Sequence, residues 1–226
     1  MGYVGPVDHE EDAPLAKPAT EPQRIGLMAD SHGNLEATRL ALRILYERDA
    51  GVIIHLGDIG DSVRYHDLQK ILDLLSEHRV LSVKGNNDYL ITLALGDRSG
   101  RHQPGCPGIF LKQLPMKRIM GDLCFAHSLP FDYHRAFYDP VDDGTTKQAE
   151  KLMRETAHRI LFCGHSHTPV LFRMQAGHVT REHPLPGKKV LLRKEERYIV
   201  VVGALDHGEC ALYDERSGIY ERIKIF

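Results

Sequence analysis

Three short apolar segments near the start of the chain alternate with two segments of helical pattern, and each apolar segment ends in polar residues. Arg24–Ala29, Gly51–Leu56 and Arg79–Val83 have the length and the continuous apolar character of buried strands. Leu35–Arg48 and Ser62–His78 carry apolar residues along one helical face. Because strands that alternate with helices pair in parallel, this order predicts an α/β sheet with its functional site beyond the carboxyl ends of the strands.

The remaining chain predicts a more mixed architecture. A helix at Tyr89–Leu95 precedes a stretch rich in glycine and proline, up to Gly121, which we expect to form a surface excursion. A strand at Asp122–Ala126, a helix at Thr145–His158 and a strand at Arg159–Cys163 are expected next. Five further runs are expected to be antiparallel strands: Val170–Met174, Lys189–Leu192, Tyr198–Val202, Glu209–Tyr213 and Ile219–Ile225.

Metal-ligating side chains follow five of the predicted strands. The fragments are Asp30-Ser31-His32, Gly57-Asp58, Gly85-Asn86-Asn87-Asp88, His127 and Gly164-His165-Ser166-His167. Residues two apart in extended backbone share a face, so each pair in the first and last fragments can converge on one ion. We expect all five strand ends to lie along one sheet edge. Carboxylate, amide and imidazole donors gathered there would suit two transition-metal ions, an arrangement that recurs in the cleavage of phosphate esters.

Each fragment also has a structural interpretation when it is taken alone. Asp58 after a glycine is typical of a turn or a helix cap, and Asn86 is typical of a turn because asparagine tolerates left-handed backbone. His127 behind an apolar run is more often structural than functional. The paired histidines after Gly164 are a stronger signal of a metal site. The joint order of the fragments favours the functional interpretation over a set of independent coincidences.

That order closely resembles the calcineurin-like metallophosphoesterases, and in particular their compact prokaryotic phosphodiesterase-like branch. The similarity runs from about Arg24 to Thr168 and continues plausibly to Phe226. It also includes the Leu-Pro before the His127 strand and the Ala-His-Ser-Leu-Pro around it. The resemblance implies an α/β (α+β) fold, a two-layered β-sandwich of mixed sheets flanked by helices.

The resemblance further implies a dinuclear metal centre. It assigns Asp30, His32 and His167 to a first ion, Asn86, His127 and His165 to a second, and Asp58 to a bridge between them. The ions would be divalent transition metals, with Mn²⁺ favoured and iron, Zn²⁺ or Ni²⁺ as alternatives, because mixed nitrogen and oxygen ligands suit these ions better than Mg²⁺. A hydroxide shared by both ions would attack phosphorus in line with the leaving oxygen.

Two catalytic residues are predicted beside the ligands, Asn87 and Asp88. Many family members read Gly-Asn-His-Asp where this chain has Gly85-Asn86-Asn87-Asp88. Asn87 can donate a hydrogen bond but cannot deliver a proton near neutral pH, so we expect weak activity on esters with poor leaving groups. Asp88 is expected to orient the ligand loop, with a helix cap as the alternative. His134, His207 and Cys163 are weak candidates to replace the missing proton donor.

The chain departs from the family pattern in two more places. Where the branch typically has Gly-His-Thr-His, this chain has Ser166 in the third position. Where many members have an Asn-Pro-Gly-Ser-like loop, it reads Val202-Gly203-Ala204-Leu205, which leaves the substrate contacts of that loop open.

Composition narrows the class of partner. The formal net charge is −2, so neither duplex DNA nor an anionic membrane is expected as a partner. The expected partner is a small phosphate ester, and nucleotides are among the candidates. The four cysteines form no Cys-x-x-Cys pair, and no signal-peptide pattern is present, so we expect a cytoplasmic protein. Residues 1–22 read as a disordered leader and residues 23–226 as one domain.

Four functional hypotheses are compatible with these residues. Hydrolysis of a phosphodiester is favoured, and phosphomonoester hydrolysis is the nearest alternative. A dinucleoside polyphosphate hydrolase or a protein-phosphatase-type enzyme would keep the chemistry and change the substrate. A non-catalytic binding scaffold of the same fold is the rival from another class. The aromatic residues of the two excursions could stack a nucleobase or simply pack the excursions down: Tyr89, Phe131, Tyr133, Phe137 and Tyr138.

Overall fold

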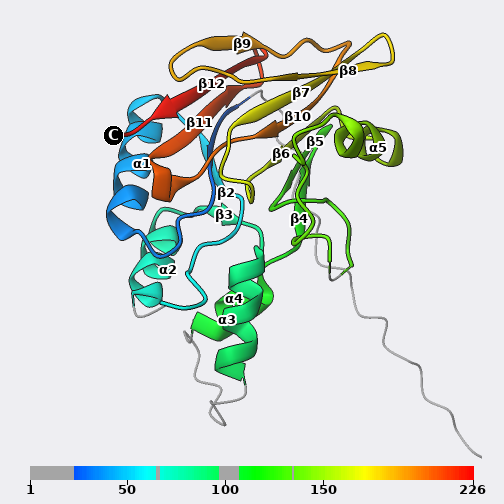
Figure 1. The fold of residues 1–226 in the computed structure, drawn as a ribbon. Helices are drawn as coiled ribbons and strands as arrows, with labels where there is room; N and C mark the ends of the chain where they lie inside the picture. The colour runs from blue at the N-terminus through cyan, green and yellow to red at the C-terminus, as the bar shows by residue number, and fades with distance from the viewer. Residues whose placement is uncertain (1–22, 65–66, 97–106, 134) are drawn as a thin grey trace, which may run out of the picture.

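Two mixed β-sheets pack face to face and are flanked by helices (Figure 1). The computed structural model describes residues 23–64, 67–96, 107–133 and 135–226. Within these residues, each sheet has six strands, in the orders β3-β2-β1-β11-β12-β9 and β4-β5-β6-β10-β7-β8. This is the two-layered sandwich that the family resemblance implied. The leader predicted for residues 1–22 lies outside the described residues.

The elements have the following bounds. The first sheet contains β1 (Arg24–Met28), β2 (Val52–His55), β3 (Leu81–Ser82), β9 (Lys189–Leu191), β11 (Glu209–Asp214) and β12 (Ile219–Lys224). The second contains β4 (Lys117–Met120), β5 (Leu123–Ala126), β6 (Ile160–Cys163), β7 (Val170–Gln175), β8 (His178–Glu182) and β10 (Arg197–Val201). The helices are α1 (Leu35–Glu47), α2 (Leu68–Glu77), α3 (Asn86–Gly96), α4 (Pro107–Gln113), α5 (Lys147–Glu155) and the short 3₁₀ helix η1 (Leu205–His207).

Each sheet has a parallel half and an antiparallel half. In the first sheet β1, β2 and β3 run parallel, with Ile25 opposite Val52 and Ile54 opposite Leu81. In the second, β5, β6 and β10 run parallel. The remaining pairings are antiparallel, as the turn-rich sequence after β6 predicted. Parallel strands carry their carboxyl-end loops to the same end of a sheet, and the predicted ligands follow these strands.

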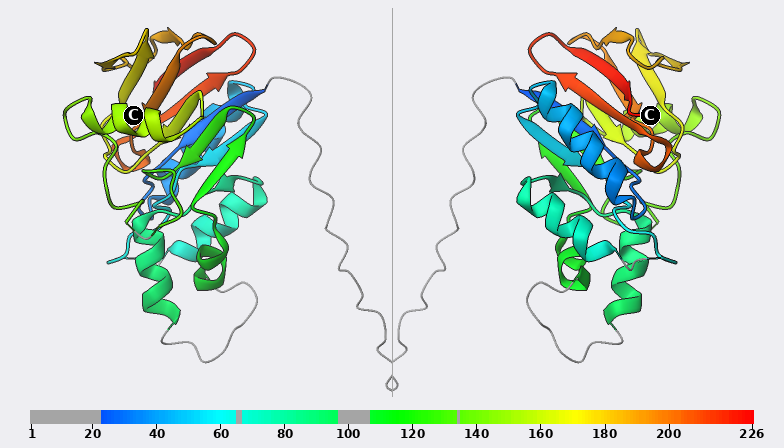
Figure 2. Two further views of the ribbon diagram at one scale, coloured as in Figure 1. Left: turned by 90° about the vertical axis from the view of Figure 1, so that its right-hand side faces the viewer. Right: turned by 90° about the vertical axis from the view of Figure 1, so that its left-hand side faces the viewer.

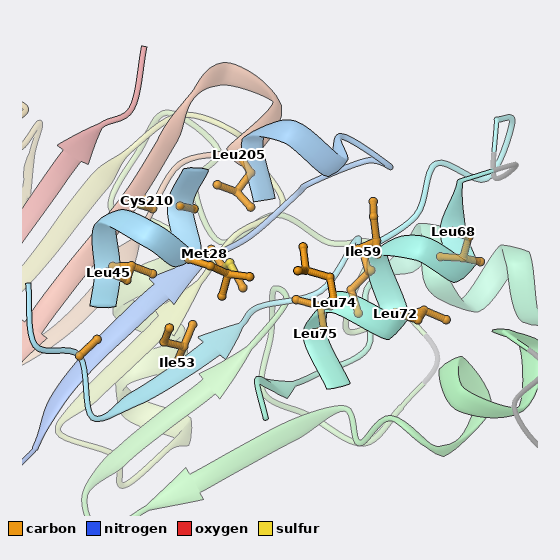
Figure 3. Close-up of a cluster of buried hydrophobic side chains, with 14 of the residues drawn as sticks. Met28, Leu45, Ile53, Ile59, Leu68, Leu72, Leu74, Leu75, Leu205 and Cys210 are labelled. Atoms are coloured by element: carbon orange, nitrogen blue, oxygen red, sulfur yellow. The ribbon is translucent and has the colours of Figure 1, made fainter. Parts of the chain in front are cut away.

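The core has three layers because the side chains of the strands alternate. In β1, Ile25 and Leu27 belong to the buried cluster between the two sheets, which also contains the stacked rings of Phe125 and Phe162. Met28 belongs to the cluster on the outer face of the first sheet, together with Leu45 of α1 (Figure 3). The period-2 alternation of a strand therefore serves two apolar layers at once, and this explains the nearly continuous apolar sequence of β1.

Helices cover both outer faces of the sandwich. α1 and α2 pack on the first sheet, where leucine and isoleucine side chains of α2 join the cluster of Figure 3. α5 covers the second sheet from the opposite side of the molecule, whereas α3 and α4 pack against each other at one end (Figure 2). Asn34 caps α1, because its Oδ1 accepts a hydrogen bond from the backbone N–H of Ala37 at 3.0 Å.

Several element boundaries differ from the sequence prediction. α2 begins at Leu68 rather than Ser62, since the Asp61 carboxylate accepts hydrogen bonds from the N–H groups of Val63 and Arg64 and forms a turn there. α5 spans only Lys147–Glu155 of the predicted Thr145–His158. α3 begins at Asn86, three residues before the predicted start at Tyr89.

Four elements were not predicted: β4, β8, α4 and the short η1. β4 and β8 are the two edge strands of the second sheet, and most of their residues are polar or only partly buried. Edge strands of this kind carry little hydrophobic periodicity, which is the signal that sequence analysis depends on.

Replacing Leu45 tests the outer layer of the core. Leu45 is fully buried between α1 and the first sheet. We expect Leu45→Ala to lower the free energy of unfolding by about 2–5 kcal/mol, because a cavity replaces the side chain. The measurement is urea denaturation followed by circular dichroism. Leu185→Ala is the matched control, since Leu185 is 61% exposed, and it should change that free energy by less than about 0.5 kcal/mol.

Candidate metal centre

The predicted ligands converge at one end of the sandwich, on loops from both sheets. Asp30, Asp58 and Asn86 follow β1, β2 and β3 of the first sheet, whereas His127 and His165 follow β5 and β6 of the second. The expectation that all strand ends would share a single sheet edge was therefore wrong. Convergence across two sheets has a physical consequence, because the packing of one sheet on the other sets the distances between the ligands.

A first group contains Asp30, His32 and His167. His32 Nε2 lies 3.1 Å from His167 Nε2, and Asp30 Oδ1 lies 3.5 Å from His167 Nε2 and 4.0 Å from His32 Nε2. One ligand atom from each residue falls within 4.8 Å of the others, which is the spacing of donors around a single ion. The carboxylate is fully buried, whereas both imidazoles are partly open to solvent.

A second group contains Asn86, His127 and His165. The amide Oδ1 of Asn86 lies 3.0 Å from both His127 Nε2 and His165 Nδ1, and these two nitrogens are 3.2 Å apart. The outer nitrogens of the rings have other partners. His127 Nδ1 lies 2.9 Å from the carbonyl oxygen of Leu56, and His165 Nε2 lies 3.1 Å from that of Tyr138. A ring N–H that donates to a carbonyl leaves the inner nitrogen unprotonated and available as a ligand.

Asp58 lies between the two groups. Its Oδ2 is 3.9 Å from His32 Nε2 and its Oδ1 is 3.6 Å from His127 Nε2. Asn87 holds this carboxylate from the other side, with its backbone N–H donating to Oδ1 at 2.8 Å and its side-chain Nδ2 donating to Oδ2 at 2.7 Å. Asn87 Oδ1 in turn accepts a hydrogen bond from Ser62 N. The amide of Asn87 therefore contacts the central carboxylate and the 61–64 turn.

Five of the seven predicted ligands have left-handed backbone. The φ angles are 53° for Asp30, 43° for His32, 56° for Asp58, 70° for His165 and 58° for His167. A non-glycine residue rarely adopts this conformation, and each instance costs of order 1 kcal/mol or more. Such strain gathers where function requires a side-chain direction that regular backbone cannot provide. The concentration of left-handed residues here is independent evidence that the loops were selected for the site.

Two glycines are required by close approach of the ligand loops. A Cβ on Gly85 would overlap the backbone nitrogen and Oδ1 of Asp58. A Cβ on Gly164 would lie 2.5 Å from Asp30 Oδ2 and 2.6 Å from the Cβ of Ala29. The glycines before Asn86 and His165 therefore allow loops of different strands to come together.

Asp88 is fully buried beneath the ligand loops. Its carboxylate accepts hydrogen bonds from the backbone N–H groups of Asp58, Ile59 and Gly85 at 2.9 Å each, and from Gly60 at 3.3 Å. Burial, with a contribution from the nearby Asp58, raises the pKa of Asp88 to about 6 although these N–H groups oppose the shift. Asp88 orients the loop that carries Asp58 and contacts it only through backbone, so it is placed to position a ligand rather than to touch a substrate.

The donor set fits a pair of cations. Asp30 Oδ1 is buried and has no hydrogen-bond partner within the described part of the chain, yet it faces two imidazole nitrogens. A buried carboxylate oxygen without a donor is costly unless a cation satisfies it. The facing Asp30 carboxylate raises the pKa of His167, and, although burial opposes the shift, the facing His167 and His127 lower the pKa of Asp30. Converging carboxylate, amide and imidazole donors would hold transition-metal ions at these positions.

Some residues at the site were not found by sequence reasoning. Asp206 Oδ1 lies 3.7 Å from His167 Nδ1, on the outer side of that ring. A cavity of about 520 Å³ adjoins the first group. It is lined by His32, Gly33, Asn34, Asp61, Arg64, Asp67, His167 and Asp206. The acidic residues of this cavity come from separated segments without a shared motif, so no local sequence pattern predicted that they would lie together.

The three weak candidates for a proton donor have different outcomes. Cys163 is buried, and its thiol lies 3.7 Å from the carbonyl oxygen of Val200. Burial raises the pKa of this thiol, so Cys163 is a poor proton donor at neutral pH. The His207 ring packs edge-on against His167 with the ring centroids 5.3 Å apart. His134 lies outside the described residues.

The chain belongs to the calcineurin-like phosphoesterase superfamily. The model of the calcineurin-like phosphoesterase superfamily domain matches residues 24–208, which include every predicted ligand. The family resemblance drawn from the five fragments is thereby confirmed. No curated protein sequence matches this chain.

Solved structures share the fold. A metallophosphoesterase from Sphaerobacter thermophilus is similar at 22% identity with a TM-score of 0.69, over 90% of this chain and 89% of the other. A protein from Thermus thermophilus has 12% identity and a TM-score of 0.54, over 91% of this chain and 100% of its own. A candidate diadenosine tetraphosphatase has 14% identity and a TM-score of 0.54, over 92% and 95%. At these identities the likeness establishes the fold.

Gly85 offers a test of the loop packing around Asp58. We expect Gly85→Ala to weaken the binding of Mn²⁺ by more than about tenfold, because the new Cβ must displace the Asp58 carboxylate. The measurement is isothermal titration calorimetry with MnCl₂. Gly121→Ala is the control: a Cβ on Gly121 would have no atom within 4 Å, and only its positive φ of 58° disfavours alanine there, so stability should fall slightly while Mn²⁺ binding stays unchanged. Equal affinities in both variants would contradict the proposed role of Asp58.

Proposed function

We propose that this protein is a metal-dependent hydrolase of phosphodiesters that uses two divalent transition-metal ions, with phosphomonoesters as the nearest alternative substrates. The observation that carries the proposal is the arrangement of the seven donors. Three lie in each of two groups, and the Asp58 carboxylate lies within 4 Å of a histidine of each group. Two sites that share one carboxylate are the arrangement expected of a bridged metal pair.

The residues divide the work in the following way. When bound, two such ions acidify a shared water and neutralise charge on the phosphoryl oxygens. Asp58, held by Asn87, fixes the separation of the two groups. The hydrogen bonds from His127 to Leu56 and from His165 to Tyr138 keep the ligand nitrogens unprotonated. We favour Mn²⁺, because the mixed nitrogen and oxygen donors suit it, and keep iron, Zn²⁺ and Ni²⁺ as alternatives.

Neither Asn87 nor Cys163 is a good proton donor for the leaving group. The side chain of Asn87 is already bonded to Asp58 and to Ser62 N, and an amide has no acidic proton. Proton donation to a leaving group is worth roughly 10²- to 10⁴-fold in rate. We therefore propose that the natural substrate is a diester with an acidic leaving alcohol, or one whose leaving oxygen is stabilised by an ion.

The organic part of the substrate has two surfaces available. The cavity beside the first group is polar and carries Arg64 and three aspartates. On the side of the second group, the ring of Tyr138 packs on Phe137 and that of Phe137 on Tyr89, and Tyr138 is 37% exposed. An exposed ring beside a metal site can stack a nucleobase, so a nucleotide ester, including a dinucleoside polyphosphate, remains the alternative substrate class.

Two further proposals accompany the activity. A binding scaffold is disfavoured, because all seven donor positions are filled and converge.

We propose a cytoplasmic location, supported by three buried free cysteines, Cys124, Cys163 and Cys210, whereas Cys106 lies outside the described residues. None of the described helices has the length and apolar character needed to cross a membrane.

Hydrolysis of a series of aryl methyl phosphates tests both the proposed phosphodiesterase activity and the expected lack of a proton donor for the leaving group. With Mn²⁺ we expect turnover of the nitrophenyl ester and a fall of about 100-fold or more for the unsubstituted phenyl ester, because Asn87, at the position of the family histidine, cannot protonate the poorer leaving group. The measurement is kcat/KM for each ester. Equal rates for the two esters would show that a proton donor is present.

Substitution of the central carboxylate ties this activity to the site. Asp58→Asn should reduce turnover of the nitrophenyl ester to background, because the neutral amide cannot be shared by two ions. Asp73→Asn on the surface of α2 is the matched control and should keep wild-type activity. A wild-type protein that binds divalent metal but turns over neither diesters nor monoesters would contradict the enzymatic proposal.

A further inference from the structure

Ser31 and His55 form a buried hydrogen-bonded link beneath the loops of the first metal group. Ser31 lies between the ligands Asp30 and His32, and His55 is the last residue of β2. Ser31 Oγ lies 2.9 Å from His55 Nε2 and 3.0 Å from the carbonyl oxygen of Ile59. Both side chains are fully buried. Neither residue is a predicted metal ligand.

The hydrogen-bond pattern determines the tautomer of His55. The carbonyl of Ile59 can only accept, so the Ser31 hydroxyl donates to it and must itself accept from His55 Nε2–H. His55 Nδ1, which has no partner within the described residues, is then an unprotonated acceptor. The opposite tautomer would bury an unpaired Nδ1–H and break the Ser31 hydrogen bond to the Ile59 carbonyl, which would keep only its bond from Gly33 N, and this costs more. Burial lowers the pKa of His55 to about 3, so the ring is neutral.

The link joins the segments that most need support. Asp30 and His32, on either side of Ser31, both have left-handed backbone, and so does Asp58, next to Ile59. Backbone bonds from Asp30 N to Gly57 O and from His32 N to Asp58 O align the two loops. The Ser31 hydroxyl adds the side-chain connection from these loops to the end of β2. Strained conformations persist only where surrounding contacts over-determine them.

We propose that His55 and Ser31 are positioning residues that hold the strained Asp30–His32 loop in its ligating conformation and thereby set the metal affinity of the first group. This inference rests on the metal centre proposed above. It predicts an asymmetric effect, because the link contacts the Asp30–His32 loop and not Asn86, His127 or His165.

Calorimetric titration with Mn²⁺, using Ser31→Ala and His55→Phe, tests this asymmetry. We expect each variant to lose about tenfold or more in affinity at one of two sites, as is typical when an outer partner of a ligand is removed, and to keep the other within about twofold. The double variant should lose no more Mn²⁺ affinity than the single variant that binds Mn²⁺ less tightly, because both substitutions remove the same link. At two equivalents of Mn²⁺, the electron paramagnetic resonance spectrum should show an uncoupled ion instead of the coupled pair of the wild type.

Thr156→Val separates positioning from general stability. Thr156 Oγ1 donates to Leu152 O at the end of α5 and accepts from Arg197 Nη2, and none of these residues is a predicted ligand, so the variant also loses hydroxyl hydrogen bonds. It should lower the melting temperature without changing either Mn²⁺ affinity. Wild-type affinity at both sites in Ser31→Ala and His55→Phe, or equal weakening of both sites, would overturn the positioning role alone. A wild-type protein that binds no Mn²⁺ would overturn the metal centre and this inference together.

Discussion

The contact between the loops of the two sheets is the constraint on which the site depends. The Asp30 carboxylate, at the end of β1, accepts a hydrogen bond from the backbone N–H of His165, at the end of β6. Gly164 N bonds to His127 O in the same region, and a side chain on Gly164 would separate the loops. Because each ligand group takes donors from both sheets, the predicted ligands come together only when the two sheets are packed on each other. The rigidity of the core is thereby transmitted to the ligands.

Much of this arrangement could be predicted from the sequence, for a physical reason. The five fragments follow apolar strands, and strand ends in parallel sheets collect at one end of a domain, so the amino-acid sequence alone sufficed to bring together ligands that are far apart in the chain. Hydrophobic periodicity located β1, β2, β5 and β6 within one or two residues. It failed for the edge strands β4 and β8, whose solvent-facing residues weaken the alternation.

The sequence could not indicate how the ligand loops are built. The left-handed conformations of Asp30 and His165 are imposed by long-range contacts, as is the convergence of two sheets on one site. Asn87 illustrates the same limit. Its identity showed that a family histidine was absent, but only the structure shows both its backbone and its side chain bonded to Asp58. The partners of Asp206 and His55 likewise could not be predicted from the sequence, because each pairing is a single contact between distant segments.

The charges around the site follow a consistent logic. Asp30 and Asp58 lie in it, Asp206 lies on the outer side of the His167 ring, and Asp88 lies beneath the loops, bonded to four backbone N–H groups. Among the seven predicted ligands, only Asp30 and Asp58 carry negative charge, since Asn86 and the imidazoles are neutral ligands. With two divalent ions bound, two carboxylates would leave a net positive centre, which would attract an anionic phosphate ester and stabilise the charge that develops during the proposed hydrolysis. An aspartate in place of Asn86 would weaken that attraction, so the neutral amide at this position is part of the chemistry.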